Sequence, residues 1–459
     1  MVDTDAAKSF PDVAEVQPGA PPSSSGNLPA SLVFPFRTAF APRFGLALRL
    51  PKQAVVRAGF GINYTVGQYA AFATNMARQP TVLPPEFVNE QTNEATYAGE
   101  LSLADGFPSP PSPATSTTQA TPGSYALDPH YRLPYVETWN LDVQKRLPWG
   151  IVMNVGYNGS KGNHLDITSA PRILPCPANG ASVPGCPGSP ACALVQTGPI
   201  PSSCVLFNYE QSAAYSKFNA GTLRVNKQLS NGIALGANYQ YSHSIDNAGS
   251  VGGTSTVVAQ NWQNLGAEEG NSSFDQRHKV TGTYLYELPF GKDKFWVTSG
   301  AASHILEGFS VSGSFTFATG MPLTPSYQAA VADVARGTAG TLRPDRVPGV
   351  SLTSGGGSLK EWFNTAAFAA PAANSSGYVY GNASRNSIPA PGIVQNNMSL
   401  SKTMQLGDTR SMELRATANN VFNTVQYSGV DTGLASPTFG QVTSARSMRA
   451  FQFTARFRF

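Results

Sequence analysis

Residues Ser447–Phe459 read Ser-Met-Arg-Ala-Phe-Gln-Phe-Thr-Ala-Arg-Phe-Arg-Phe, and this stretch decides the fold class. Side chains of a β-strand alternate between two faces, so one face would carry Phe451, Phe453, Ala455, Phe457 and Phe459 and the other Gln452, Thr454, Arg456 and Arg458. A helix would scatter these residues around its circumference without an apolar stripe. An extended strand that is apolar outward, polar inward and aromatic at its tip is typical of a transmembrane β-barrel.

The same alternation recurs along the chain and predicts about eleven antiparallel strands. None of the predicted strands contains an internal proline, although the chain has 36, because proline cannot donate a ladder hydrogen bond. Such segments lie at 43–50, 53–64, 139–144, 151–158, 222–226, 233–242, 279–288, 309–317, 397–401, 412–419 and 451–459.

Connections between these segments alternate between short and long. Tight turns are predicted at Pro51-Lys52, Pro148-Trp149, Ser230-Asn231-Gly232 and Gly407-Asp408, and a medium connection runs through Pro289 and Gly291. The long loops cover 65–136, 159–216, 244–277, 319–394 and the segment before the last strand. Short turns on one side and long loops on the other predict an outer-membrane barrel with periplasmic turns and extracellular loops.

Eleven is an odd number, whereas bacterial single-chain barrels use even numbers of strands. The first and last predicted strands run in the same direction, so an odd number of further strands must separate them. An open sheet would leave roughly five unpaired groups along each edge in lipid, which costs tens of kcal/mol. We therefore expect the C-terminal half of a larger barrel, or a chain truncated at an internal methionine.

The composition excludes several other classes of protein. Charged residues make up 13% of the chain, about half the usual 25%. The net charge is only +4, and the sequence contains no run of Lys and Arg that could bind nucleic acid. No apolar run is long enough for a transmembrane helix. The N-terminal residues lack a signal peptide, so a barrel would need an exporting segment upstream. Residues 1–38 are predicted to be disordered or a loop, and 39–459 to be barrel.

Four cysteines lie in one Pro/Gly-rich stretch, at Cys176, Cys186, Cys192 and Cys204. This pattern predicts two disulfides that staple a loop in an oxidising compartment, and three pairings are open. Zinc binding is the alternative, but neither a Cys-x-x-Cys spacing nor a neighbouring histidine supports it.

Several phrases in combination resemble the Oar-like β-barrel of TonB-dependent receptors, over roughly Phe40 to Phe459. They are Tyr-Val-Glu-Thr-Trp-Asn-Leu-Asp-Val-Gln from Tyr135, Val-Gly-Tyr-Asn-Gly-Ser from Val155, Ser-Phe-Asp-Gln-Arg-His from Ser273, Glu-Leu-Arg from Glu413, Asn-Val-Phe-Asn from Asn420, and the terminal Phe459. The resemblance implies a 22-stranded outer-membrane barrel, a TonB complex that acts through a plug, and an unknown ligand. The family's regulatory domain, TonB box and plug are not visible in this sequence, so this chain alone is not expected to transport.

Candidate functional positions lie on both predicted faces. Lumen-facing Arg57, Arg224, Glu413 and Arg415 could contact substrate or plug, or could form a solvated inner wall. Phe457 and Phe459 resemble the C-terminal signal that the barrel-assembly machinery recognises. Lys402 faces outward but lies near a turn, where it can reach water. An interfacial aromatic girdle is expected from Tyr64, Trp139, Tyr157, Tyr241 and Tyr286.

An enzyme is not expected, because the five scattered histidines form no catalytic or metal-binding motif and no nucleotide-binding motif occurs. No cofactor is therefore predicted. The sequence favours a receptor that captures a ligand for energised transport across the outer membrane. A surface adhesion or structural protein and a passive porin are the alternatives.

Overall fold

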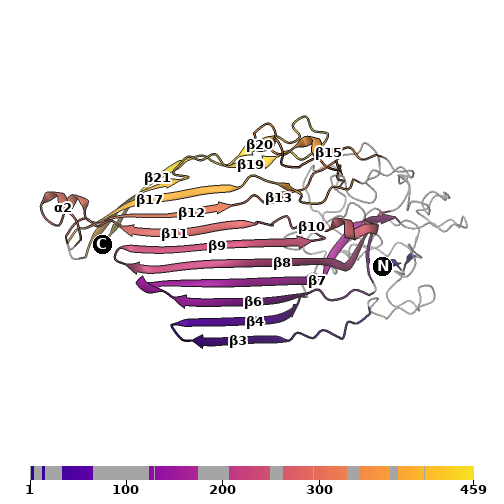
Figure 1. Cartoon of the computed structure of the whole chain (residues 1–459), viewed down its shortest axis with the longest axis horizontal. Helices are drawn as coiled ribbons and strands as arrows, with labels where there is room; N and C mark the ends of the chain where they lie inside the picture. Colours follow the sequence, from indigo (N-terminus) through magenta and orange to yellow (C-terminus); the bar gives the residue numbers. More distant parts are fainter. Residues whose placement is uncertain are drawn as a thin grey trace, which may run out of the picture.

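Eleven strands form one continuous antiparallel sheet in the order β21-β18-β17-β12-β11-β9-β8-β7-β6-β4-β3 (Figure 1). The computed structural model describes residues 2–4, 13–15, 34–65, 124–128, 130–173, 206–248, 262–292, 294–327, 342–372, 381–407 and 409–459. The number of strands and their antiparallel pairing confirm the prediction. The strands are β3 Arg43–Leu50, β4 Ala54–Tyr64, β6 Tyr135–Arg146, β7 Ile151–Ile173, β8 Leu206–Ser230, β9 Ile233–Asp246, β11 His278–Glu287, β12 Phe309–Ala318, β17 Ile393–Gln405, β18 Ser411–Asn419 and β21 Ala450–Arg458.

Short elements decorate this sheet, mainly at one end. Within the described residues, β5 (Ser124–Leu127) adds to β8 in parallel and β10 (Gly270–Asn271) adds to β9. The remaining pairs are β1 Val2–Thr4 with β2 Val13–Glu15, β13 Pro322–Leu323 with β16 Ile388–Pro389, β14 Asp345–Arg346 with β15 Phe368–Ala369, and β19 Tyr427–Val430 with β20 Val442–Ala445. The helices in the described part of the chain are η1 Pro148–Gly150, η2 Trp262–Glu268, α2 Ala301–Leu306 and η4 Thr365–Ala367.

The tight turns all lie at the same end of the sheet, which we call the short-turn end (Figure 1). The β8–β9 turn has Asn231 at φ 52° and Gly232 at φ 76°, the two positive values that a type I′ hairpin requires. Trp149 and Gly150 repeat this pattern between β6 and β7. The β11–β12 connection, 288–308, differs because it contains α2, which the sequence analysis did not predict. The long connections leave from the opposite end, the long-loop end.

The prediction that 159–216 is a loop is wrong at both ends. β7 continues to Ile173 and β8 already begins at Leu206, and the two strands stay paired through three register shifts. Each shift moves side chains to the other face, and His164 has a positive φ of 53°. The alternating pattern is therefore lost although the ladder continues. The four cysteines lie in 174–205, outside the described residues.

The register places most apolar residues of the strands on the same side of the sheet, from one edge to the other. Phe44 pairs with Phe60 at one edge, Leu141 with Tyr157 further in, and Leu414 with Ala455 near the other edge. We call this side the apolar face and the opposite side the polar face. The apolar face is open to solvent in the isolated chain, since Phe44 is 70% and Phe453 79% exposed. The predicted division of outward and inward residues is confirmed.

Three aromatic side chains on the apolar face lie across a glycine of the neighbouring strand. A Cβ at Gly159 would lie 2.2 Å from the Trp139 ring, and one at Gly282 would lie 2.3 Å from Phe315. Gly313 has the same relation to Tyr284. On the polar face, Gly59 similarly makes room for the amide of Asn140. These glycines are therefore needed for close packing.

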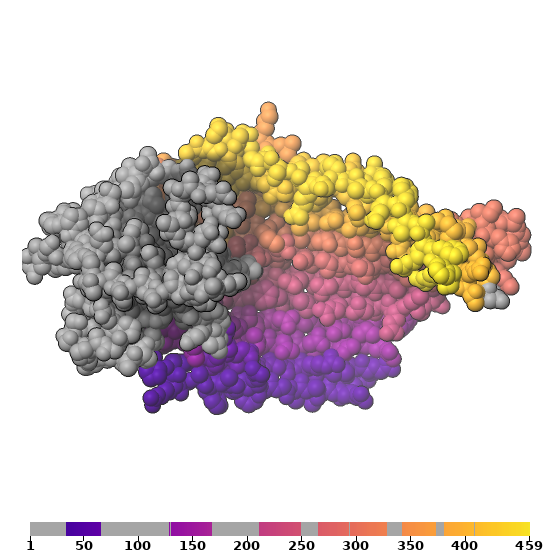
Figure 2. Space-filling model, turned by 180° about the vertical axis from the view of Figure 1, so that it is seen from behind, coloured from indigo at the N-terminus to yellow at the C-terminus, as the bar shows by residue number. Residues whose placement is uncertain are grey.

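The two edge strands of the sheet run in the same direction. Both β3 and β21 end at the short-turn end, and among the described residues each pairs on one side only (Figure 1). Figure 2 shows the sheet from behind, with the indigo edge of β3 and the yellow edge of β21 far apart. Direct pairing of these edges would be parallel, so an antiparallel closure requires an odd number of intervening strands.

Candidate ligand-binding face

Basic residues outnumber acidic ones on the polar face. The register places on it Arg43, Arg49, Arg57, Arg146, Arg224, Lys279, Arg415, Arg456 and Arg458, against Asp142, Asp246, Glu287 and Glu413. All four predicted lumen-facing residues, Arg57, Arg224, Glu413 and Arg415, lie on this face. The sheet does not bring them into one cluster, because β4 and β8 are separated from β18 by several strands.

The one charged side chain of β4, Arg57, is held by the neighbouring strand β6. Arg57 donates to the side chain of Gln144 at 2.9 Å, and its guanidinium lies 3.6 Å from Asp142. Arg57 is about half exposed, so this ion pair is screened and contributes little to stability. Its guanidinium remains accessible for contact with an anion.

Near the other edge, Arg415 donates to Glu413 within β18 at 2.6 Å. Arg456 lies opposite Glu413 in the register and Arg458 opposite Ser411, so this part of the face also carries excess positive charge. Arg224 lies between Asn154 and Asn238 and is in no ion pair among the described residues.

The strands between these basic regions carry a lining of neutral polar side chains. Ser399 and Thr417 hydroxyls lie 2.9 Å apart, those of Ser310 and Ser401 lie 3.2 Å apart, and Asn397 donates to Ser314. These bonds join β12, β17 and β18 from one strand to the next. The polar face is thus a hydroxyl- and amide-lined wall flanked by arginines, which can contact a polar or anionic solute.

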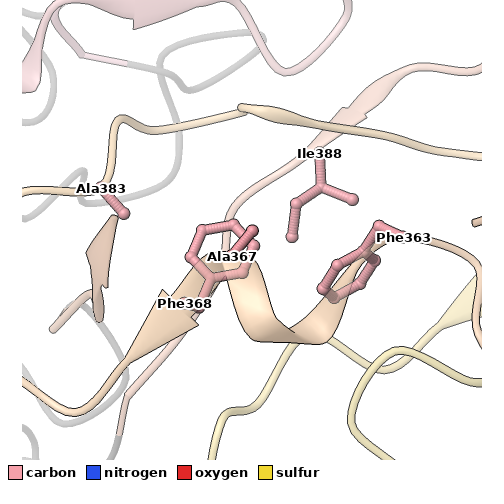
Figure 3. Packing of buried hydrophobic residues seen from close by; sticks show 5 residues of the cluster. All are labelled: Phe363, Ala367, Phe368, Ala383 and Ile388. Atoms are coloured by element: carbon pink, nitrogen blue, oxygen red, sulfur yellow. The ribbon is translucent and has the colours of Figure 1, made fainter. Parts of the chain in front are cut away.

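At the long-loop end, connecting segments fold into a compact unit with its own apolar core. We call 319–327, 342–372, 381–392 and 420–446 the loop cluster. Its core contains Phe363, Ala367, Phe368, Ala383 and Ile388, all buried (Figure 3). Phe363 contacts Phe368 and Phe439 edge to face, with ring centroids 5.8 and 5.2 Å apart. The long loop predicted at 319–394 therefore contains a packed core, which the sequence analysis missed.

A buried ion network attaches the loop cluster to the sheet. Arg343 donates two hydrogen bonds to Glu268, at 2.7 and 3.0 Å, and both side chains are less than 4% exposed. Arg385 donates to the Asp246 carboxylate at 2.5 Å and lies 3.8 Å from Glu268. Asp246 ends β9 and Glu268 ends η2, so the network connects the β12–β17 loop to the β9–β11 loop.

The phrase Ser273–His278 forms a joint where β11 begins. Asp275 accepts a hydrogen bond from the backbone N–H of Ser244 at 2.7 Å and one from Arg277 at 3.2 Å. Gln276 donates to the carbonyl of Thr319 at 3.2 Å. The joint fixes β9, β11 and the end of β12 together, so these polar residues position strands rather than perform chemistry.

The phrase Asn420–Asn423 forms a second joint after β18. Asn420 and Asn423 have φ values of 50° and 54°, a conformation that asparagine tolerates. The Asn420 side chain donates to the carbonyl of Thr424 and accepts from its N–H, and Asn423 accepts from the N–H of Arg449. The turn therefore sets the start of the loop that returns to β21.

Among the titratable groups at the long-loop end with altered pKa values are Tyr215 and Asp431. Burial, together with the hydrogen bond to the nearby carboxylate of Glu269, raises the pKa of Tyr215 to about 12. Burial also raises the pKa of Asp431, but hydrogen bonds from Ser436, Thr438 and the Gly433 N–H outweigh it and leave the pKa below its usual value. Both groups therefore keep their charge state, neutral tyrosine and charged aspartate, at neutral pH.

Three of the aromatic residues predicted for an interfacial girdle lie toward the two borders of the apolar face. Tyr157 and Tyr241 lie in one row near the long-loop end, and Tyr286 lies near the short-turn end. Between Ile233, which pairs with Tyr286, and Tyr241 there are eight residue steps (241 − 233), roughly 27 Å along the strand. This spacing fits an apolar band about 25 Å tall. Phe457 lies opposite Met412, and Phe459 is 95% exposed beyond it.

Across the described residues, no group of three or more His, Cys, Asp or Glu side chains is arranged to hold a metal ion. The helices in this part of the chain are all too short or too polar to cross a membrane.

A family model described as outer membrane beta barrel domain matches residues 3–452. No curated protein matches this sequence. Solved structures with a similar fold include the outer membrane transporter YddB from Escherichia coli, with a TM-score of 0.48 and 9% identity over 91% of this chain and 40% of that one. The siderophore receptor PiuA from Acinetobacter baumannii has a TM-score of 0.40 and 8% identity, over 91% of this chain and 35% of that one. The pyoverdine outer membrane receptor FpvA from Pseudomonas aeruginosa PAO1 has a TM-score of 0.38 and 10% identity, over 91% and 36%. The chain spans 40% or less of the length of these three structures.

Proposed function

The chain belongs to the outer membrane beta-barrel domain family, and from this premise we propose that it is part of a TonB-dependent receptor that captures an anionic ligand. The protein is located in the outer membrane, with the apolar face toward lipid and the polar face toward the lumen. The observation that carries the proposal is the excess of arginine on the polar face, next to a packed loop cluster at the long-loop end. A rigid loop cluster can present a defined surface to a ligand, and the arginines can then attract its negative charge.

In this proposal the chain contributes eleven strands to a barrel of 22. The common direction of β3 and β21 supports it, because eleven further strands are an odd number and would restore antiparallel pairing at both edges. A plug within that barrel would contact Arg57, Arg224 and Arg415 and would carry the contact with TonB. We also propose that Phe457 and Phe459 form the signal for the barrel-assembly machinery and that the four cysteines form two disulfides. No enzymatic activity is part of the proposal.

The test uses the protein purified from its native outer membrane in detergent, with the periplasmic domain of TonB from the same cell as the probe. A receptor is expected to bind this domain and to remain closed to ions in planar bilayers. Steady conductance without TonB binding would instead identify a passive porin. Absence of both, together with loss of cell-surface adhesion on deletion of 174–205, would identify an adhesion protein.

The ligand class has a separate test in the same protein. Arg57→Gln combined with Arg224→Gln should weaken binding of anionic compounds from the native medium, measured by retention on the immobilised receptor. Lys161→Gln, on the apolar face at the long-loop end, is the control. Equal retention by the control and the double variant would refute an anionic ligand while leaving the receptor role intact.

A further inference from the structure

The β11–β12 connection extends past the short-turn end of the sheet (Figures 1 and 2). We call residues 288–308 the arm. Phe295 is 81% exposed, Ile305 63% and Trp296 53%, although the other connections at this end are tight turns. Exposed apolar residues that gather on one element indicate an interaction surface.

Hydrogen bonds and ring contacts give the arm a defined fold. The backbone N–H of Trp296 donates to the carbonyl of Pro289 at 2.8 Å, and the N–H of Gly291 donates back to Trp296 at 3.2 Å. The Trp296 ring lies 5.8 Å from that of Phe290 and 5.7 Å from that of Phe295. The exposed side chains are therefore held in place rather than carried by a frayed loop.

The arm is also fixed to the neighbouring strand β17. The N–H of Thr403 donates to the carbonyl of Gly308 at 2.9 Å. Gly308 has a φ of 75°, and a Cβ there would lie 2.1 Å from the Thr403 carbonyl oxygen. Only glycine permits this close approach, so the end of the arm cannot shift along β17.

Lys402 shows on which side of the sheet the arm lies. It belongs to the apolar face, where it pairs with Phe309 on one side and Leu414 on the other. Its ammonium donates to the carbonyl of Ile305 at 2.6 Å and lies 5.1 Å from the Phe309 ring centre. The end of α2 is thus placed over the apolar face, one step beyond the row of Tyr286, Val311 and Leu400. The Lys402 contact therefore joins the end of α2 to the border of the lipid-facing band.

Two lysines accompany the apolar tip. Lys292 is exposed, and Lys294 lies beside Phe295 with its ammonium 3.0 Å from Glu287. Ammonium groups next to aromatic rings suit a phospholipid surface, where rings prefer the interface and cations meet phosphate. These observations favour lipid over a protein partner.

We propose that the arm is an interfacial anchor, with Phe295, Trp296 and Ile305 inserted among the phospholipid headgroups of the periplasmic leaflet. It would hold the short-turn end of the barrel at a fixed depth, independently of ligand capture. The anchor follows from outer-membrane location alone and does not depend on the receptor role.

The test places the full chain in phosphatidylethanolamine/phosphatidylglycerol vesicles whose acyl chains are brominated close to the headgroup. The emission of Trp296 is obtained as the difference between the unmodified chain and Trp296→Phe, so the other four tryptophans cancel. We expect brominated lipid to quench Trp296 emission several-fold, with little quenching by aqueous iodide. Phe295→Ser combined with Ile305→Ser should reverse this preference, whereas Leu359→Ser, an exposed leucine of the loop cluster, should not.

Trp139, on the apolar face, provides the internal reference through the matching variant Trp139→Phe. Quenching of Trp139 by brominated lipid, with Trp296 quenched only by iodide, would overturn the anchor and favour a protein partner. If brominated lipid quenches neither tryptophan, the chain does not present its apolar face to the bilayer. That result would also refute the proposed anchor.

Discussion

Removing Arg343 should unfold the loop cluster locally while the sheet remains folded. The Arg343 guanidinium is buried and donates to both carboxylate oxygens of Glu268 and to the carbonyl of Ala383 at 2.8 Å. In Arg343→Met, the Glu268 charge stays buried with Arg385, 3.8 Å away, as a weaker neighbour. Breaking a buried pair in this way costs about 3–5 kcal/mol.

The assay is hydrogen exchange measured by mass spectrometry on the protein in detergent. A cost of about 3–5 kcal/mol corresponds to exchange by local opening that is roughly 10²- to 4 × 10³-fold faster. The acceleration should appear in peptides covering 342–350 and 381–390, and strands β11 and β12 should keep their protection. Lys294→Met breaks an ion pair that is about 40% exposed and should change exchange by less than about 1 kcal/mol equivalent.

A second variant separates the pair from the packing around it. Arg343→Met combined with Glu268→Met replaces both charges by apolar groups of similar length and should recover much of the lost protection, because replacing both members of a buried pair is often nearly neutral. Arg385 keeps its hydrogen bond to Asp246 in that variant. Unchanged exchange in the single variant, or simple addition of two losses in the double, would refute the reasoning.

Three further predictions concern other parts of the molecule. Phe363→Ala should destabilise the loop cluster by about 3–5 kcal/mol, since the ring is 1% exposed, and chemical denaturation followed by Tyr and Trp fluorescence would show an early transition. Gly159→Ala should displace the Trp139 ring, at a cost of about 1–3 kcal/mol, and shift its emission maximum; an unchanged spectrum would contradict the packing. The lowered pKa of Asp431 adds stability above the unfolded carboxyl pKa of about 3.9, and this stability is lost as pH falls through the lower native pKa. The protection factors of 427–445, which are exchange rates corrected for the intrinsic rate at each pH, should therefore fall in acid. Asp431→Asn should abolish that pH dependence.

The sequence predicts the strands of the sheet because lipid on one face and water on the other impose a period of two. Phe451 to Phe459 and their partners in β18 show this pattern in almost every position. The parts of β7 and β8 at the long-loop end were not predicted, because register shifts there move side chains from one face of the sheet to the other. The strict alternation of apolar and polar residues, which predicts the other strands, is absent from these segments.

The loop cluster and the arm could not be predicted in the same way. Arg343 and Glu268 are 75 residues apart, and only the folded loops bring them together. Trp362, Phe363 and Phe368 gave one usable indication, since three aromatic residues within seven positions are unusual in a solvated loop. Strand alternation assigns Arg57, Arg224, Glu413 and Arg415 to one side of the sheet, and the register places them on the polar face. Their contact with a substrate or plug stays a prediction.

The shared direction of β3 and β21 limits how this sheet could be used in protein engineering. Two copies of the chain fused in tandem would place two strands side by side in parallel at each junction, at odds with the rest of the ladder. A complementation partner for a split barrel must instead begin and end on strands that run toward the long-loop end. Such a partner can dock at both edges with antiparallel bonds, and its strand number must be odd.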